Sequence, residues 1–161
     1  MSVSWRHLPK PARAVAEATE GAVAAARARD LPAFEASAAA LAALESEHVA
    51  LVLGTVTRLL LEDLHPGGLA VDDVRALVGR CAREAAGWFP AVDADVLVML
   101  VAGALGVYQP EAEAFPLQAD GVARHAVVLV ADLLAVSGHP LDACLSAAFA
   151  DIAVVQTSDT P

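Results

Sequence analysis

Several residue types are scarce in this sequence of 161 residues, and each scarcity narrows what the protein can be. Aromatic residues make up only 4% of the chain, and asparagine is absent. A surface that stacks nucleobases between aromatic and basic side chains is therefore disfavoured. The 10 basic residues are outnumbered by 20 acidic ones, which gives a formal net charge of -10. We therefore expect no binding to nucleic acid, and none to an anionic membrane surface.

Cysteine occurs only twice, as Cys81 and Cys144, and the pair forms no CxxC motif. Two cysteines so far apart do not make a disulfide framework, so we expect a reduced, cytoplasmic protein whose thiols are inert packing groups. Residues Met1–His7 lack the apolar region of a secretory signal. The longest uncharged apolar run, Val96–Tyr108, is shorter than the ~20 residues that span a bilayer, which predicts no membrane insertion.

Hydrophobic residues, many of them alanine, make up 57% of the chain. This composition excludes disorder, because so much apolar surface offsets the conformational entropy lost on folding. Alanine is the best helix former, and apolar residues recur at helical spacing. The sequence therefore predicts one all-α domain over residues 1–161, a bundle of about six to seven helices. We expect an irregular lead-in at 1–10 and a frayed tail at 157–161. The bias toward alanine, arginine and valine is typical of a GC-rich bacterial genome.

Capping residues and helix breakers predict where the helices begin and end. Residues 31–64 are compatible with one helix or with two. Ser46 can cap a new helix with Glu47 in its first turn, so we favour a break there. The other helices are expected from Pro9 to about Arg29, from Asp72 to Gly87, over Val96–Tyr108, over about Leu117–Ser137, and from His139-Pro140 onward.

The segment Val96–Tyr108 is apolar on all sides and is preceded by Asp93 as an N-cap. A β-strand is the rival interpretation because of its valines, but the run is longer than a typical strand. A helix that is apolar all round belongs in the interior. We therefore expect this helix to be the buried central element of the bundle.

Glycine residues give the Val96–Tyr108 helix a face on which another backbone can approach closely. Close helix packing at this face is the favoured interpretation. The alternative is that the same space admits an apolar ligand beside neighbouring large side chains. The candidate residues for either role are Trp88, Phe89, Met99, Gly103, Gly106 and Tyr108.

The sequence offers no catalytic constellation. The motifs Glu45–His48 and Glu62–His65 have the spacing of di-iron ligands, but they lie about 25 Å apart along mostly one helix. The five histidines form no zinc motif, and no serine lies in a GxSxG turn. His125 and Asp132 lie two turns apart on one helix face and are interpreted as a polar stripe. We therefore expect no catalytic residues, no metal and no cofactor.

The excess of apolar residues is the main indication of function. A domain of this size cannot hide so much apolar surface in one core without leaving patches, and such patches are usually interfaces. We therefore expect a soluble, non-enzymatic protein that acts through protein–protein interaction, as a homodimer. The alternative is a binding module for an apolar small molecule in a pocket beside the central helix.

Overall fold

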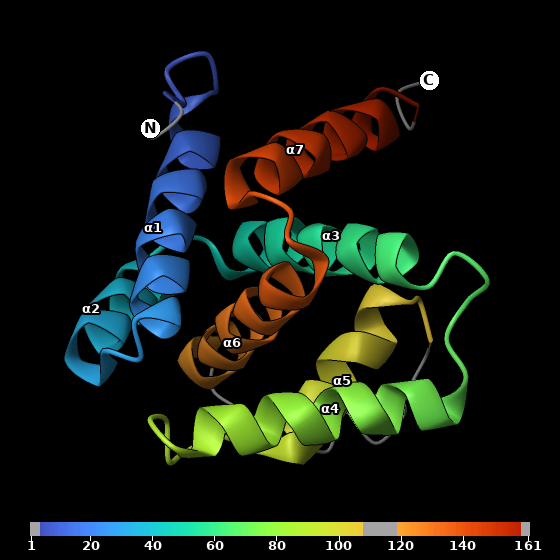
Figure 1. The fold of residues 1–161 in the computed structure, drawn as a ribbon. Helices are drawn as coiled ribbons and strands as arrows, with labels where there is room; N and C mark the ends of the chain where they lie inside the picture. The colour runs from blue at the N-terminus through green and yellow to red at the C-terminus, as the bar shows by residue number, and fades with distance from the viewer. Residues whose placement is uncertain (1–3, 108–118, 159–161) are drawn as a thin grey trace.

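The structure, a computed structural model, describes residues 4–107 and 119–158, and these form seven helices and no strand (Figure 1). The predicted all-α bundle of about seven helices is confirmed. The helices are α1 (Lys10–Arg27), α2 (Leu31–Ala42), α3 (Ser46–Leu64), α4 (Val71–Ala86), α5 (Ala94–Ala104), α6 (Ala119–Ser137) and α7 (Leu141–Ser158).

Side-chain caps set the starts of two helices, and the sequence predicts the one at Asp93. The Asp30 carboxylate accepts a hydrogen bond from the backbone N–H of Ala33 at 3.1 Å, and α2 begins there. The Asp93 carboxylate accepts from the N–H of Asp95 at 2.9 Å, at the start of α5. The break before Ser46 is also confirmed, because α2 and α3 are separate helices bent by 119° relative to each other. Ser46 is not the cap, however, since it is the first residue of α3 and the N-cap position is Glu45, which forms no side-chain capping bond.

Gly106 terminates α5, which is shorter than the sequence predicts. The Gly106 N–H donates to the Gly103 carbonyl at 3.1 Å, and the Val107 N–H donates to the Ala102 carbonyl at 2.9 Å. This turn requires a left-handed residue, and Gly106 has a φ of 77°. Glycine adopts that conformation without a steric penalty, so the helix stops at Ala104.

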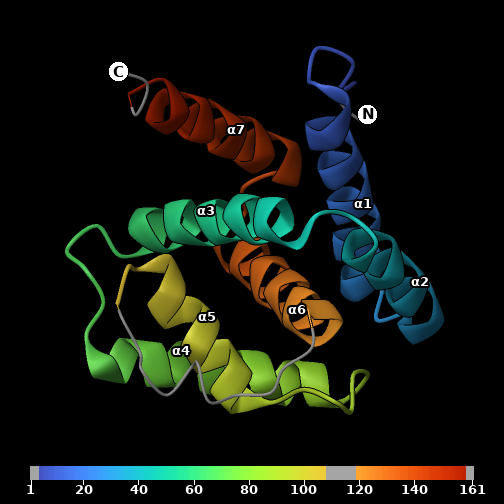
Figure 2. The same cartoon turned by 180° about the vertical axis from the view of Figure 1, so that it is seen from behind.

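The central helix of the bundle is α6. It contacts α1, α2, α3, α4 and α5 and lies among them (Figures 1 and 2). The prediction that the Val96–Tyr108 segment is the central helix is wrong. In α5 only Val96, Leu97 and Val101 are buried. The most deeply buried side chains of α6 are instead Val127, Leu129, Val130, Leu133 and Leu134, each with no exposed surface.

Polar side chains of α6 are accommodated because they bind partners on neighbouring elements. Asp132 Oδ2 accepts from Arg80 Nη2 of α4 at 2.6 Å, and its side chain is 7% exposed. Arg124 Nε donates to Glu35 of α2 at 2.7 Å. Arg80 therefore binds α6 with its charged end and does not project freely into solvent. A charged group is tolerated near the core only when such a partner is present.

Helix α7 is the least covered of the described helices. It contacts mainly α3, and both ribbon views place α3 between α7 and the α4–α5 pair (Figures 1 and 2). Only Leu145, Ala148 and Ile152 are fully buried in it. By length and composition α7 is the one described helix that could cross a membrane alone, and packed helices of globular proteins meet the same criteria.

Contacts at the N-terminal end and helix at the C-terminal end extend into the segments that the sequence predicts to be irregular or frayed. Residues 4–9 form no helix, yet the Trp5 side chain is 3% exposed. Its ring packs edge-on against Phe149, with 6.2 Å between centroids, and its indole N–H donates to Glu20. At the other end α7 includes Thr157 and Ser158, the first two residues of the predicted frayed tail, and residues 159–161 lie outside the described residues.

These burials predict a contrast between two leucine-to-alanine substitutions. Leu133→Ala should lower the free energy of unfolding by about 2–5 kcal/mol, since Leu133 is fully buried in α6. Leu100→Ala should cost less than about 2 kcal/mol, because Leu100 is half-buried and lines an open pocket. Urea midpoints measured at unchanged slope test this order. Equal losses, or a larger loss at Leu100, would contradict the central position of α6.

Candidate functional site

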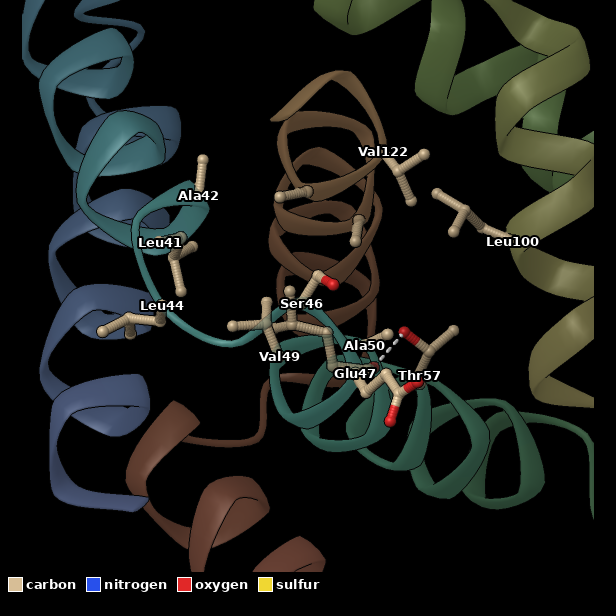
Figure 3. A pocket seen from close by; sticks show the side chains of 14 residues that line it. Leu41, Ala42, Leu44, Ser46, Glu47, Val49, Ala50, Thr57, Leu100 and Val122 are labelled. Atoms are coloured by element: carbon tan, nitrogen blue, oxygen red, sulfur yellow. Dashed lines mark hydrogen bonds between the residues drawn. The ribbon is translucent and has the colours of Figure 1, made fainter. Parts of the chain in front are cut away.

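An open, apolar pocket of about 310 Å³ lies where α2, α3, α5 and α6 meet. Figure 3 shows Leu41, Ala42 and Leu44 on one side of it, and Leu100 of α5 next to Val122 of α6 on the other. The floor is formed by residues of α3 and α6, namely Val49, Ala50, Leu53, Gly54, Ala123 and Ala126. This volume and this composition are typical of small-molecule sites.

A second hollow of about 350 Å³ continues the first between α3 and α5. The two share Ala50, Gly54 and Leu100, so they form one elongated depression, which we call the α3–α5 groove. Six of the α3 residues that line it repeat every three or four positions, which places these six on one face of the helix. They are Glu47, Ala50, Leu51, Gly54, Thr55 and Arg58, and the opposite wall carries Met99, Leu100, Gly103 and Ala104.

The groove exists because small residues stand where side chains would otherwise fill it. A Cβ atom placed on Gly54 or on Gly103 would meet no heavy atom within 4 Å. Gly103 is also exposed. The expectation that Gly103 marks a close helix crossing is therefore wrong. Gly54 and Gly103 both face open space, so they leave an accessible apolar surface between α3 and α5.

The threonine hydroxyls in the groove are already satisfied within α3. Thr55 Oγ1 donates to the Leu51 carbonyl at 2.7 Å, and Thr57 Oγ1 donates to the Leu53 carbonyl at 2.8 Å (dashed line in Figure 3). Because each hydroxyl already donates its proton to a carbonyl of the preceding turn, it has no proton left to donate to a ligand. The middle of the groove therefore presents an essentially apolar surface.

Charged groups stand only at the two ends of the described groove. At one end Arg58 binds Glu62 at 3.0 Å and Asp151 of α7 at 2.7 Å, so its charge is neutralised. At the other end Glu47 is exposed and forms no ion pair among the described residues. Glu47 is therefore the uncompensated charge at the rim.

The structure brings together only two of the six residues that the sequence singled out. Met99 and Gly103 line the groove. Gly106 acts as the helix terminator of α5 and does not line it. Tyr108 lies outside the described residues.

Trp88 and Phe89 belong to an aromatic cluster away from the groove. Phe34 of α2 packs edge-on against both rings, with centroid distances of 5.0 and 5.4 Å. Phe89 is also 5.5 Å from the His125 ring. These contacts fasten the end of α4 to α2 and α6. Trp88 and Phe89 therefore serve packing.

Most residues of the groove were not anticipated from the sequence. Leu41, Val49, Leu53 and Val122 have the appearance of ordinary core positions on amphipathic helices. The one available signal was Gly54, which interrupts an otherwise strong apolar helix. A glycine in a helix interior costs stability, so its presence usually has a packing or functional reason.

His125 links α6 to the start of α5. Its Nδ1 lies 2.7 Å from the Gly121 carbonyl, and its Nε2 accepts from the Asp93 backbone N–H at 2.9 Å. This arrangement requires the neutral ring with the proton on Nδ1. His125 and Asp132 therefore do not form a unit, because Asp132 binds Arg80.

Neither cysteine is a candidate nucleophile. Burial, followed by the nearby Asp132 carboxylate, raises the pKa of the Cys81 thiol to about 12. Burial also raises the pKa of Cys144. Because only the thiolate reacts, both side chains are poor nucleophiles at neutral pH. Over the described residues no group of three or more His, Cys, Asp or Glu side chains is placed to hold a metal ion.

The Cys81 environment predicts a pH dependence of stability. In the unfolded chain this thiol has its ordinary pKa near 9, so above pH 9 the unfolded state binds fewer protons than the native state. Stability contributed by the neutral thiol is complete below pH 9 and falls as the pH rises toward 12. Cys81→Ala should reduce this loss in urea titrations. Iodoacetamide should label native Cys81 much more slowly than the unfolded chain, because burial both lowers the thiolate fraction and limits access. Rapid labelling of native Cys81 would contradict its buried placement.

Comparisons with known proteins add no family to this description. No protein-family model matches the chain, and neither a curated protein nor a solved structure matches it.

Proposed function

We propose that this protein is a non-enzymatic binding module for an apolar small molecule, which occupies the α3–α5 groove. The observation that carries the proposal is a pocket of about 310 Å³ with an apolar lining, open above Gly54. Burial of a ligand there would be driven by the removal of apolar surface from water. This ligand-binding role was the alternative interpretation of the sequence, and it is now the favoured one.

The lining of the groove suits binding better than catalysis. Thr57, which lines the pocket, donates a hydrogen bond to the Leu53 carbonyl. Glu47 is the one carboxylate that lines the pocket, and the lining contains no histidine, cysteine or lysine that could act with it or with the Ser46 hydroxyl as a second acid or base. Reactions of the common acid–base and nucleophilic types need at least two such groups in mutual reach.

Gly54→Leu tests the proposed site directly. The new side chain enters empty space, so the urea midpoint should hold or rise, helped by a helix propensity about 1 kcal/mol better than that of glycine. The same side chain would occupy the ligand's volume. Binding of the uncharged dye N-phenyl-1-naphthylamine, followed by its fluorescence, should weaken about tenfold or more.

The matched control is Ala76→Leu, which adds a leucine on the exposed side of α4. It should leave dye binding unchanged. Equal binding by the wild-type protein and Gly54→Leu would place the dye elsewhere and contradict the proposed site.

A second candidate function is self-association through α7, in line with the homodimer expected from the sequence. Five exposed residues of α7 follow a 4-3-4-3 spacing on the side opposite its buried residues, and none is charged. They are Ala143, Ala147, Ala150, Val154 and Thr157, and we call them the α7 seam. Small apolar residues at this spacing allow another helix to pack closely.

Val154→Glu tests the seam. Val154 is 63% exposed, so the substitution should leave the fold intact while placing a charge in any helix pair formed through α7. If the seam is a two-fold interface, light scattering should give about twice the monomer mass of 16.5 kDa for the wild type and the monomer mass for the variant. Val71→Glu, at a residue 67% exposed on α4, should not change the mass. A wild-type monomer at high concentration would exclude this function.

A further inference from the structure

We propose that the ligand of the α3–α5 groove is an elongated alkyl chain with a neutral or cationic polar end, bound with that end at Glu47 and its tail at Gly103. The inference rests on the proposed binding function and assigns the chemical class and the orientation of the ligand.

The shape of the groove supports an elongated ligand. From Glu47 to Arg58 its floor follows α3 for about 16 Å. The two hollows join above Ala50 and Gly54, where small residues keep the passage open. A compact ligand would fill only one hollow. A flexible chain can occupy both, and each methylene buried in the second hollow adds to the affinity.

The polar groups at the two ends support the orientation. Glu47 and Ser46 lie beside the first hollow, where Figure 3 shows both side chains at the rim. Neither has a hydrogen-bond partner among the described residues. At the far end Arg58 is already bound to two carboxylates, so it offers little to a ligand's anionic group. The polar end of the ligand is therefore best placed beside Glu47.

The charge of the rim determines which polar end is accepted. The exposed carboxylate of Glu47 repels a fatty-acid carboxylate and attracts an ammonium group or accepts a hydrogen bond from a hydroxyl group. The chain as a whole carries a formal charge of -10, which acts in the same direction at low salt. We therefore rank long-chain amines above alcohols, and alcohols above carboxylates.

The first experiment measures displacement of N-phenyl-1-naphthylamine by decylamine, decanol and decanoate, each below its micelle concentration. Decylamine should bind about two- to fivefold more tightly than decanol, the range of an exposed ion pair, and decanoate should bind most weakly. Glu47→Gln should abolish the difference between decylamine and decanol without changing the affinity for decanol. Added salt should reduce the same difference in the wild type. Tightest binding of decanoate, or an unchanged ranking in Glu47→Gln, would overturn the assigned class.

The second experiment tests the position of the tail with Gly103→Leu, which fills open space in the second hollow. This variant should bind decylamine several-fold more weakly and hexylamine as tightly as the wild type, since the shorter chain ends before Gly103. Equal effects on both chains, or no effect on either, would overturn the orientation.

Failure of this inference is distinguishable from failure of the proposed function. If the dye and all three decyl compounds fail to bind the wild type, the binding function itself is excluded. If they bind in a Gly54→Leu-sensitive manner without regard to charge or length, the groove binds apolar molecules and only the class and orientation are wrong.

Discussion

The burial of α6 is the constraint on which the rest of the structure depends. A helix surrounded by five others can carry polar side chains only if each finds a partner, because an unpaired charge in an apolar interior costs several kcal/mol. Asp132, Arg124 and His125 meet this condition through Arg80, Glu35 and the Asp93 backbone. These bonds orient α4, α2 and the start of α5 around one helix, and so define the space between α5 and α3.

The α3–α5 groove is the consequence of that arrangement combined with the small residues at Ala50, Gly54, Gly103 and Ala104. Close packing is normally achieved when larger side chains interdigitate across a helix pair. Here the glycines leave unfilled space without leaving an unsatisfied polar group, since Thr55 and Thr57 bond within their own helix. An apolar depression whose polar wall groups already have hydrogen-bond partners is suited to bind a ligand by excluding water.

The side chains of Cys81, Cys144 and His125 do not line the α3–α5 groove. Cys81 lies on another side of α6, with a thiol pKa raised to about 12, and His125 has both ring nitrogens engaged by the backbone. The Cys81 thiol and the His125 imidazole, which could otherwise take part in catalysis, are thus buried or bonded within the helix packing. What remains available to a partner is apolar surface, in the groove and along α7, together with the Glu47 carboxylate.

The sequence by itself determined the helical class, the seven helices and most of their boundaries. These depend on local signals, such as the caps at Asp30 and Asp93 and the break at Ser46, that act within a few residues. It also placed Met99 and Gly103 together in a candidate site. Only the tertiary structure decided which apolar helix lies at the centre, because α6 hides its charges by pairing across more than fifty residues of sequence, as Asp132 does with Arg80. The same holds for Gly103, whose local sequence is equally consistent with crowding and with empty space. The packing of α5 against α3 leaves Gly103 beside a groove that Gly54 of α3 also lines, and no local pattern records which helix packs there.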